Sequence, residues 1–351
     1  MELHCHSGFS FLDGASHPEE LILRAEELGY RALALTDHNG LYGSMEFAQR
    51  ARAHGIQPVT GAEVTVAGCF PGRDDPVAPR TGAPELEDPF RSGHHLTLLA
   101  ESPEGYANLC RLLTEAHMEA PERGRPRLDL ASLLARTEGL VCLTGCRRSP
   151  LLDALGSSVA DGEAFAGRLL DAFGPGGLFV ELQHNRARGD ARRTKSLARL
   201  ADRLGIPVVA TGNVHYHRRS RHRLQDVLVA VRNRATLDGS HEARRPNACH
   251  HLASPAEVAR RFRSRPDALR ATLAIAERCA SFDLTEDLGY TFPDFEGSGN
   301  GKSALQILAE TCRSRLEERY PGPGVGSAPG GRRKTREKRA EAERRLREEL
   351  A

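Results

Sequence analysis

Short apolar stretches alternate along this chain with longer segments in which apolar residues recur every three or four positions. The first pattern is typical of buried strands and the second of amphipathic helices. Strands are predicted at 31–35, 56–66, 95–100, 140–144, 178–182 and 206–210. Helices are predicted at 41–54, 103–117, 149–156, 161–173, 191–204, 219–232, 254–263, 266–280 and 303–319. A further helix is predicted between a capping box at Ser16–Glu19 and its end at Gly29.

The regular alternation of strand and helix predicts parallel strands joined by crossover helices, and hence an α/β sheet or barrel. Residues 67–93 lack periodicity and are rich in Gly, Pro, Arg and Asp, so we expect an inserted surface loop there. Residues 1–284 are predicted to form the α/β domain. Residues 285–351 are predicted to form an extension that contains a Gly/Pro linker at 321–331.

The composition narrows the class of protein. The chain has 351 residues, of which 39% are hydrophobic, and it contains no apolar run long enough to span a membrane. Its N-terminus does not resemble a signal peptide, so we expect a cytoplasmic protein without a membrane segment. The net charge of +2 does not indicate a nucleic-acid binder. The eight cysteines form no CxxC pair and are expected to be mostly reduced structural thiols, with room for one metal ligand among them.

The C-terminal tail, 332–351, is strongly charged. It carries nine Lys/Arg against five Glu, with Arg and Glu at helical spacing. This pattern is typical of a solvated helix face. A nucleic-acid contact is the alternative, but no aromatic residues accompany the basic ones to stack on bases.

Metal-ligating residue types cluster at the N-terminus. His4 and His6 project to the same side of an extended segment, and the carboxylate of Asp13 follows one short loop later. Such a set suits the first half of a divalent-metal site.

Similar residue types recur further along the chain. At or just beyond the C-terminal ends of predicted strands lie His38, Glu63, Cys146, Asn213 and His215. Because these ends meet at one rim of an α/β barrel, we expect the side chains to share a site with the N-terminal set.

Several segments, taken in order, resemble the PHP (polymerase and histidinol phosphatase) domain. They read Leu-His-Cys-His-Ser, Phe-Ser-Phe-Leu-Asp-Gly-Ala-Ser, Ala-Leu-Ala-Leu-Thr-Asp-His, Gly-Ala-Glu, His-His-Leu-Thr-Leu-Leu-Ala, Gly-Leu-Val-Cys-Leu-Thr-Gly-Cys and Thr-Gly-Asn-Val-His-Tyr. The resemblance is closest to the N-terminal domain of bacterial DNA polymerase III alpha subunits of the error-prone type. It implies a distorted (β/α)7 barrel that holds two or three divalent metal ions (Zn, Mn or Fe) at one rim.

The resemblance also implies a ligand set. The family's ligand positions fall on His4, His6, Asp13, His38, Glu63, His95, Cys146, Asn213 and His215. His94 is the alternative to His95, and Asp37 is expected to orient an imidazole. Asn213 replaces the Asp of the family's closing motif. Because an amide binds a hard cation more weakly than a carboxylate does, this substitution predicts partial occupancy or fewer ions.

The function that the resemblance implies is metal-dependent phosphoester hydrolysis, in which the ligand residues act through the bound metal. The implied substrate is a DNA 3′ end, pyrophosphate or a small phosphomonoester. The alternative is a non-catalytic domain that stabilises a polymerase or docks a replisome partner. Asn213 favours this alternative, and the other eight positions favour the enzyme.

Polymerase alpha subunits continue beyond this domain into a palm module. The chain shows no pair of acidic residues for nucleotidyl transfer downstream of the barrel, so we do not expect it to polymerise DNA. Residues 285–351 are interpreted as a truncated lead-in to the palm.

The remaining histidines are interpreted as surface or capping residues. They are His17, His54, His117, His184, His217, His222, His241, His250 and His251. His250 and His251 follow Cys249 and are a weaker candidate site, because no carboxylate is near them in the sequence.

Overall fold

The computed structural model describes residues 1–70, 93–120, 124–289, 302–320 and 329–350, and it divides into the units Met1–Leu288 and Gly289–Ala351. The strands are β1 Ala32–Leu35, β2 Gln57–Ala67, β3 His94–Ala100, β4 Leu128–Asp129, β5 Leu140–Leu143, β6 Leu178–Gln183 and β7 Val208–Thr211. The α-helices of the first unit are α1 Pro18–Glu27, α2 Ser44–Ala53, α3 Pro103–Met118, α4 Leu130–Leu134, α5 Pro150–Ser157, α6 Val159–Phe173, α7 Asp190–Leu204, α8 His222–Arg232, α9 Pro255–Arg261 and α10 Pro266–Cys279. None of the helices in the described ranges is long and apolar enough to cross a membrane.

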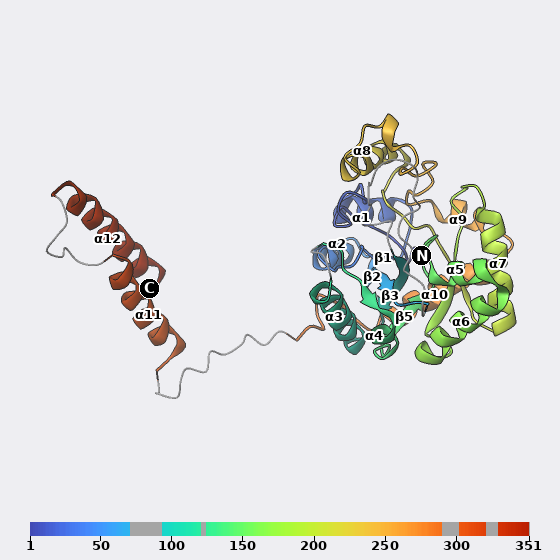
Figure 1. Ribbon diagram of the computed structural model, residues 1–351, viewed down its shortest axis with the longest axis horizontal. Helices are drawn as coiled ribbons and strands as arrows, with labels where there is room; N and C mark the ends of the chain where they lie inside the picture. Colours follow the sequence, from blue (N-terminus) through green and yellow to red (C-terminus); the bar gives the residue numbers. More distant parts are fainter. Residues whose placement is uncertain (71–92, 121–123, 290–301, 321–328, 351) are drawn as a thin grey trace. The chain divides into compact units, whose positions relative to one another are not determined.

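One mixed sheet forms the centre of the first unit, with helices around it (Figure 1). The strand order is β1-β2-β3-β5-β6-β7, and β4 pairs with β2. The pairs β1–β2, β5–β6 and β6–β7 are parallel, as predicted. Strand β3 is antiparallel to both of its neighbours, so the prediction of parallel strands was wrong there. An antiparallel neighbour needs no crossover helix, and the alternation of elements therefore does not reveal its direction.

The N-terminal segment connects the two edges of this sheet. Glu2 forms a bridge with Leu33 of β1, and Cys5 forms a bridge with Val214, just after β7. The backbone N–H of Val214 donates to the carbonyl of His4 at 2.9 Å. The sheet therefore curls into a distorted barrel, which confirms the α/β class, and the predicted His-x-His pair lies at the seam.

The inner face of the curled sheet is apolar at one end and polar at the other. On β6, Phe179 packs with the inner apolar cluster, which Ile275 of α10 joins, whereas Glu181 belongs to the polar end. On β3, Leu99 belongs to the apolar cluster and His95 to the polar end. Alternate residues of the same strands pack outward against the helices. The fold thus leaves one end of the barrel interior for polar chemistry.

Two local predictions need correction. Helix α1 begins one residue later than the predicted capping box, because His17 is its N-cap and the Glu20 carboxylate accepts from the His17 N–H at 3.0 Å. The Ser16 hydroxyl accepts instead from the backbone N–H of His217 at 2.9 Å. The short elements β4 and α4 were not predicted. Most of the predicted inserted loop, at 71–92, lies outside the described residues.

The described residues of the second unit form two helices, α11 Ala304–Arg319 and α12 Pro329–Glu349. The helix predicted at 303–319 is confirmed, although none of the side chains of α11 is buried. The predicted linker was wrong for 329–331, which are helical, and 321–328 lie outside the described residues. Ion pairs Arg344–Glu348 and Arg345–Glu349 stabilise one face of α12 at the favourable i,i+4 spacing.

Candidate metal centre

The structure brings all nine predicted ligand positions to the polar end of the barrel interior. They come from the N-terminal segment (His4, His6), its following loop (Asp13), the turn after β1 (His38), strands β2 and β3 (Glu63, His95), the turn after β5 (Cys146) and the turn after β7 (Asn213, His215). Eight are buried and His38 is partly exposed. Glu63 lies within β2 rather than at its C-terminal end, because β2 continues to Ala67. His95 lies near the start of β3, which runs antiparallel to β2.

Glu63 is the common neighbour of four of these imidazoles. Its Oε2 lies 2.9 Å from His38 Nδ1, 3.2 Å from His95 Nδ1 and 3.7 Å from His6 Nε2. Its Oε1 lies 3.3 Å from His4 Nε2. Burial raises the pKa of Glu63, but the imidazoles of His95, His38 and His4 outweigh burial and hold it well below its usual range. The carboxylate is therefore ionised at the centre of the cluster.

Hydrogen bonds fix the orientation of the first two imidazoles. His4 Nδ1 lies 2.7 Å from Glu181 Oε1 and donates to it. Ser10 donates its hydroxyl to Asp37 Oδ1 at 2.6 Å, so its oxygen accepts from His6 Nδ1 at 3.0 Å. Asp37, which was predicted to orient an imidazole, is therefore linked to the imidazole of His6 through the hydroxyl of Ser10. Such outer carboxylates are typical partners of metal-ligating histidines.

With these tautomers, the Nε2 lone pairs of His4 and His6 face one another at 3.2 Å. Two lone pairs repel, so the arrangement needs a cation or a proton between them. Burial lowers the pKa of His4, yet the carboxylates of Glu181 and Glu63 raise it to about 10. A proton on His4 therefore takes the cation's role in the metal-free chain at neutral pH.

The other half of the cluster is built around Asp13 and His215. His215 Nδ1 donates to the carbonyl of Asn213 at 2.9 Å, and its Nε2 lies 2.9 Å from Asp13 Oδ2. Arg245 Nη2 contacts His215 Nε2 and lies 3.1 Å from Asp13 Oδ2. Arg232 Nη1 lies 3.0 Å from Asp13 Oδ1. In this half, two guanidinium groups supply the positive charge.

These arginines determine the ionisation of their neighbours. Burial raises the pKa of Asp13, but Arg245, His215 and Arg232 hold it well below its usual range. Burial and Arg245 lower the pKa of His215 to about 4, so its imidazole is neutral at pH 7. Asn213, with a φ of 46°, has a buried Oδ1 without a hydrogen bond to any described residue.

The third part of the cluster contains His95 and Cys146. Cys146 Sγ lies 3.6 Å from His95 Nδ1. Burial and the Glu63 carboxylate raise the pKa of the Cys146 thiol, so a cation would have to displace its proton. His94, the alternative to His95, points to the opposite face of β3, where its Nε2 lies 3.6 Å from Asp153.

The residues present fit a borderline transition metal. Three sets of ligand atoms lie within 4.8 Å of one another: His6, His38 and His215; His4, His6 and Glu63; and His38, Glu63 and His95. Buried Glu63 Oε1 and His95 Nε2 have no hydrogen bond within the described ranges. Imidazoles, carboxylates and a thiol are the ligands that Zn²⁺ and related ions prefer. The clusters thus support metal binding.

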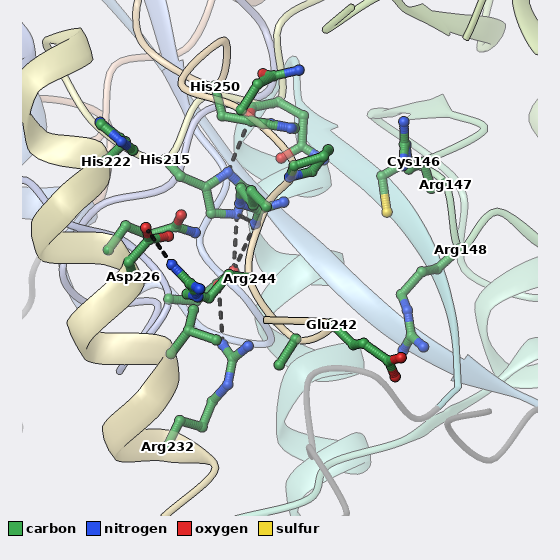
Figure 2. A pocket seen from close by; sticks show the side chains of 18 of the residues that line it. Cys146, Arg147, Arg148, His215, His222, Asp226, Arg232, Glu242, Arg244 and His250 are labelled. Atoms are coloured by element: carbon green, nitrogen blue, oxygen red, sulfur yellow. Dashed lines mark hydrogen bonds and ion pairs between the residues drawn. The ribbon is translucent and has the colours of Figure 1, made fainter. Parts of the chain in front are cut away.

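A cavity of about 710 Å³ opens over the cluster. Five arginines are among its lining residues: Arg147, Arg148, Arg232, Arg244 and Arg245. Figure 2 shows Cys146, Arg147 and Arg148 on one side of the cavity and His215 and Arg244 on the other. Such a concentration of guanidinium groups favours an anionic ligand.

Several residues of the site were missed by the sequence analysis. Glu181 could have been found, because it is an acidic residue that follows three apolar residues within strand β6. Ser10 and Arg245 carry no comparable signal, since a serine and an arginine are common in polar loops.

The interpretation of three histidines as surface or capping residues was wrong. His217, His250 and His251 are buried. His250 Nδ1 donates to the carbonyl of Asn213 at 3.0 Å. His251 Nε2 lies 3.5 Å from the carboxylate of Glu257, so the expectation that no carboxylate lies near this pair was wrong. His17 and His54 do cap α1 and α2.

Comparisons with known proteins point to one family. The family model of the PHP domain matches residues 2–185. The error-prone DNA polymerase of Mycolicibacterium paratuberculosis is 43% identical over 324 residues, which are 92% of this chain and 28% of that protein. The error-prone DNA polymerase of Symbiobacterium thermophilum is 38% identical over 315 residues, covering 85% of this chain and 27% of that protein. The chain thus spans little more than a quarter of these relatives.

Solved structures show weaker similarity. A candidate metal-dependent phosphoesterase from Bifidobacterium adolescentis is 14% identical, with a TM-score of 0.38 over 61% of this chain and 87% of that one. An amidohydrolase from Chromobacterium violaceum, solved with sulfate and no metal, is 19% identical, with a TM-score of 0.34 over the same shares.

Proposed function

Because the chain belongs to the PHP domain family, we propose that its first unit, Met1–Leu288, is a metal-dependent phosphoesterase. The observation that supports this most is the grouping of imidazoles around the ionised carboxylate of Glu63. Two of these imidazoles, His4 and His6, are held in a fixed orientation by hydrogen bonds at Nδ1, which leaves their Nε2 atoms directed into the cluster. A divalent cation held there supplies Lewis acidity toward water and phosphoryl oxygens. We infer two or three ions of Zn, Mn or Fe, held by the nine positions named above.

The residues of the cavity define the charge of the substrate. Arg147 and Arg148 adjoin Cys146 on one side of the cavity, and Arg244 lies on the other side. Arg147 and Arg244 are held by Asp190 at 2.7 Å and Asp226 at 3.1 Å, which positions each guanidinium before substrate arrives. Groups in these positions bind phosphoryl oxygens and stabilise the charge that develops on them. A phosphoester suits this cavity better than a neutral ester or amide.

The substrate that we propose is a DNA 3′ end, with pyrophosphate and small phosphomonoesters as alternatives. The similarity to error-prone DNA polymerases supports the first choice. The partners would then be DNA and the remaining parts of a polymerase or replisome, in the cytoplasm.

We expect the purified chain to contain more than one equivalent of transition metal by elemental analysis. We also expect it to hydrolyse glycerol phosphate or the 3′ end of an oligonucleotide, because the cluster and the arginines are both in place. Chelation should abolish the hydrolysis, and Zn²⁺ or Mn²⁺ should restore it. Protein that is metal-free after gentle purification, and that takes up no metal on titration, would contradict the proposal.

A second candidate is a non-catalytic domain that stabilises a polymerase. Two observations favour it: Asn213 offers no charge, and the Arg245 guanidinium contacts both Asp13 and His215. A site in which arginine supplies the positive charge between two ligands needs fewer ions to be stable.

Asn213→Asp distinguishes these candidates. The change is nearly isosteric and suits the left-handed backbone at this position, which both residues tolerate. Under the enzymatic proposal it should raise metal content or turnover, because it restores an anionic ligand. Gln49→Glu, on the exposed face of α2, adds the same charge away from the site and should alter neither. If Asn213→Asp also leaves both unchanged, residue 213 is not a ligand.

A further inference from the structure

Three aromatic side chains are exposed on one surface beside the metal centre. Phe9 is 38% exposed, Phe11 70% and Tyr42 67%. The first two belong to the loop that carries Asp13, and the third belongs to the turn between His38 and α2. Exposed apolar patches of this kind mark binding sites more often than chance.

These rings line a small pocket that adjoins the metal centre. The pocket has a volume of about 190 Å³, and its lining includes Phe9, Phe11, Tyr42, Arg125 and Arg127. His38 lines both this pocket and the large cavity. A group bound between the rings would therefore lie next to the ligand cluster. A volume below the usual 300–1,000 Å³ of a drug-sized site suits a single flat group.

The local backbone holds the rings in this position. The ring of Phe9 lies against Gly43, where a Cβ atom would be 2.5 Å from Phe9 Cδ2. The ring of Tyr42 covers Gly40 in the same way, with a distance of 2.3 Å to Cε2. Leu12, with a φ of 59°, turns the chain directly after Phe11. A non-glycine residue in this region is uncommon and indicates a loop held in a defined shape.

The chemistry of the pocket selects one class of occupant. Aromatic faces stack on nucleobases, and arginines neutralise the phosphates that follow them or stack on the same bases. Arg125 and Arg127 provide these cations here. We propose that this aromatic pocket binds the terminal base of a single-stranded nucleic acid, with the adjoining phosphoester at the metal centre. The proposal rests on the proposed function, because the phosphoester is what places the strand there.

The test is the affinity of the full chain for a short fluorescent single strand of thymidines, measured by anisotropy. Phosphorothioate linkages at the 3′ end block hydrolysis, so binding is read independently of turnover. The same strand with abasic residues at its 3′ end is the second probe. The variants are Phe11→Ala, Tyr42→Ala and the double variant, and Val159→Ala, an exposed residue of α6, is the control.

We expect wild type to bind the intact strand about tenfold or more tightly than the abasic strand, since each stacked base contributes about 5–100-fold. The double variant should lose this preference while it keeps its metal content, and Val159→Ala should behave as wild type. Equal affinity of wild type for the two strands, or an unchanged preference in the double variant, would overturn the proposal. So would wild-type self-association that the double variant abolishes, because the surface would then be a protein interface. Base-dependent binding by a chain that fails to hydrolyse phosphoesters would still support the pocket and contradict only the phosphoesterase.

Discussion

Glu63→Gln should remove most of the metal from the purified chain. Among the described residues, Glu63 is the carboxylate that contacts four of the predicted ligand imidazoles, and a neutral amide cannot offset the charge of ions held between them. Even residues that only orient a ligand are worth about 10–100-fold in metal affinity, so we expect a loss of about a hundredfold or more. Elemental analysis and titration with Zn²⁺ measure this loss.

Two further variants separate a lost ligand from a damaged fold. Glu104→Gln removes an exposed carboxylate of α3 that pairs with Arg111, and it should keep full metal content. Glu63→Asp keeps the charge but retracts the carboxylate, so its affinity should lie between wild type and Glu63→Gln. Thermal unfolding with chelator present shows whether each variant is folded. A folded Glu63→Gln protein with wild-type metal content would show that Glu63 is not a ligand.

Much of the site could be predicted from the spacing of its residues. His4 and His6 alternate on an extended segment and so project to the same side, and His215 follows the end of a predicted strand. The same reasoning from spacing and strand ends indicated Asp13, His38, Glu63, Cys146 and Asn213, and the motif resemblance added His95 rather than His94. In β3, adjacent residues point to opposite faces of the sheet, so His95 can enter the cluster only if His94 points away from it.

The direction of β3 could not be predicted, because alternation of side chains looks the same in a parallel and an antiparallel strand. The consequence for the site is considerable. His95 is the second residue of β3, whereas Cys146 lies just beyond the end of β5. Two antiparallel neighbours thus contribute residues from opposite ends to the same rim.

The role of Arg245 could not be predicted for a different reason. The segment 241–250 has no periodic pattern, and a long side chain can reach a site from many backbone positions. Its contacts with Asp13 and His215 change how the Asn213 substitution is interpreted. A neutral Asn213 and the guanidinium of Arg245 both make this half of the site more positive, so both disfavour a further cation there.

Gly14→Ala should damage the metal centre without changing any ligand. A Cβ atom on Gly14 would lie 1.8 Å from the carbonyl oxygen of Ser7, a backbone atom that cannot rotate away. The loop between them carries Ser10, which orients His6, and Asp13. We expect a loss of about 3 kcal/mol in the free energy of unfolding, or roughly 5–10 °C in Tm, together with lower metal affinity.

Gly8→Ala is the matched control for this loop. A Cβ atom there would lie 3.6 Å from the Ser16 carbonyl oxygen, which is an ordinary van der Waals distance. The same substitution six positions away in the sequence should therefore leave Tm and metal content close to wild type. If Gly14→Ala is as stable and as rich in metal as Gly8→Ala, the close approach of Gly14 to Ser7 does not hold the loop. The position of Asp13 would then depend on the contacts of its carboxylate with Arg232, Arg245, His38 and His215.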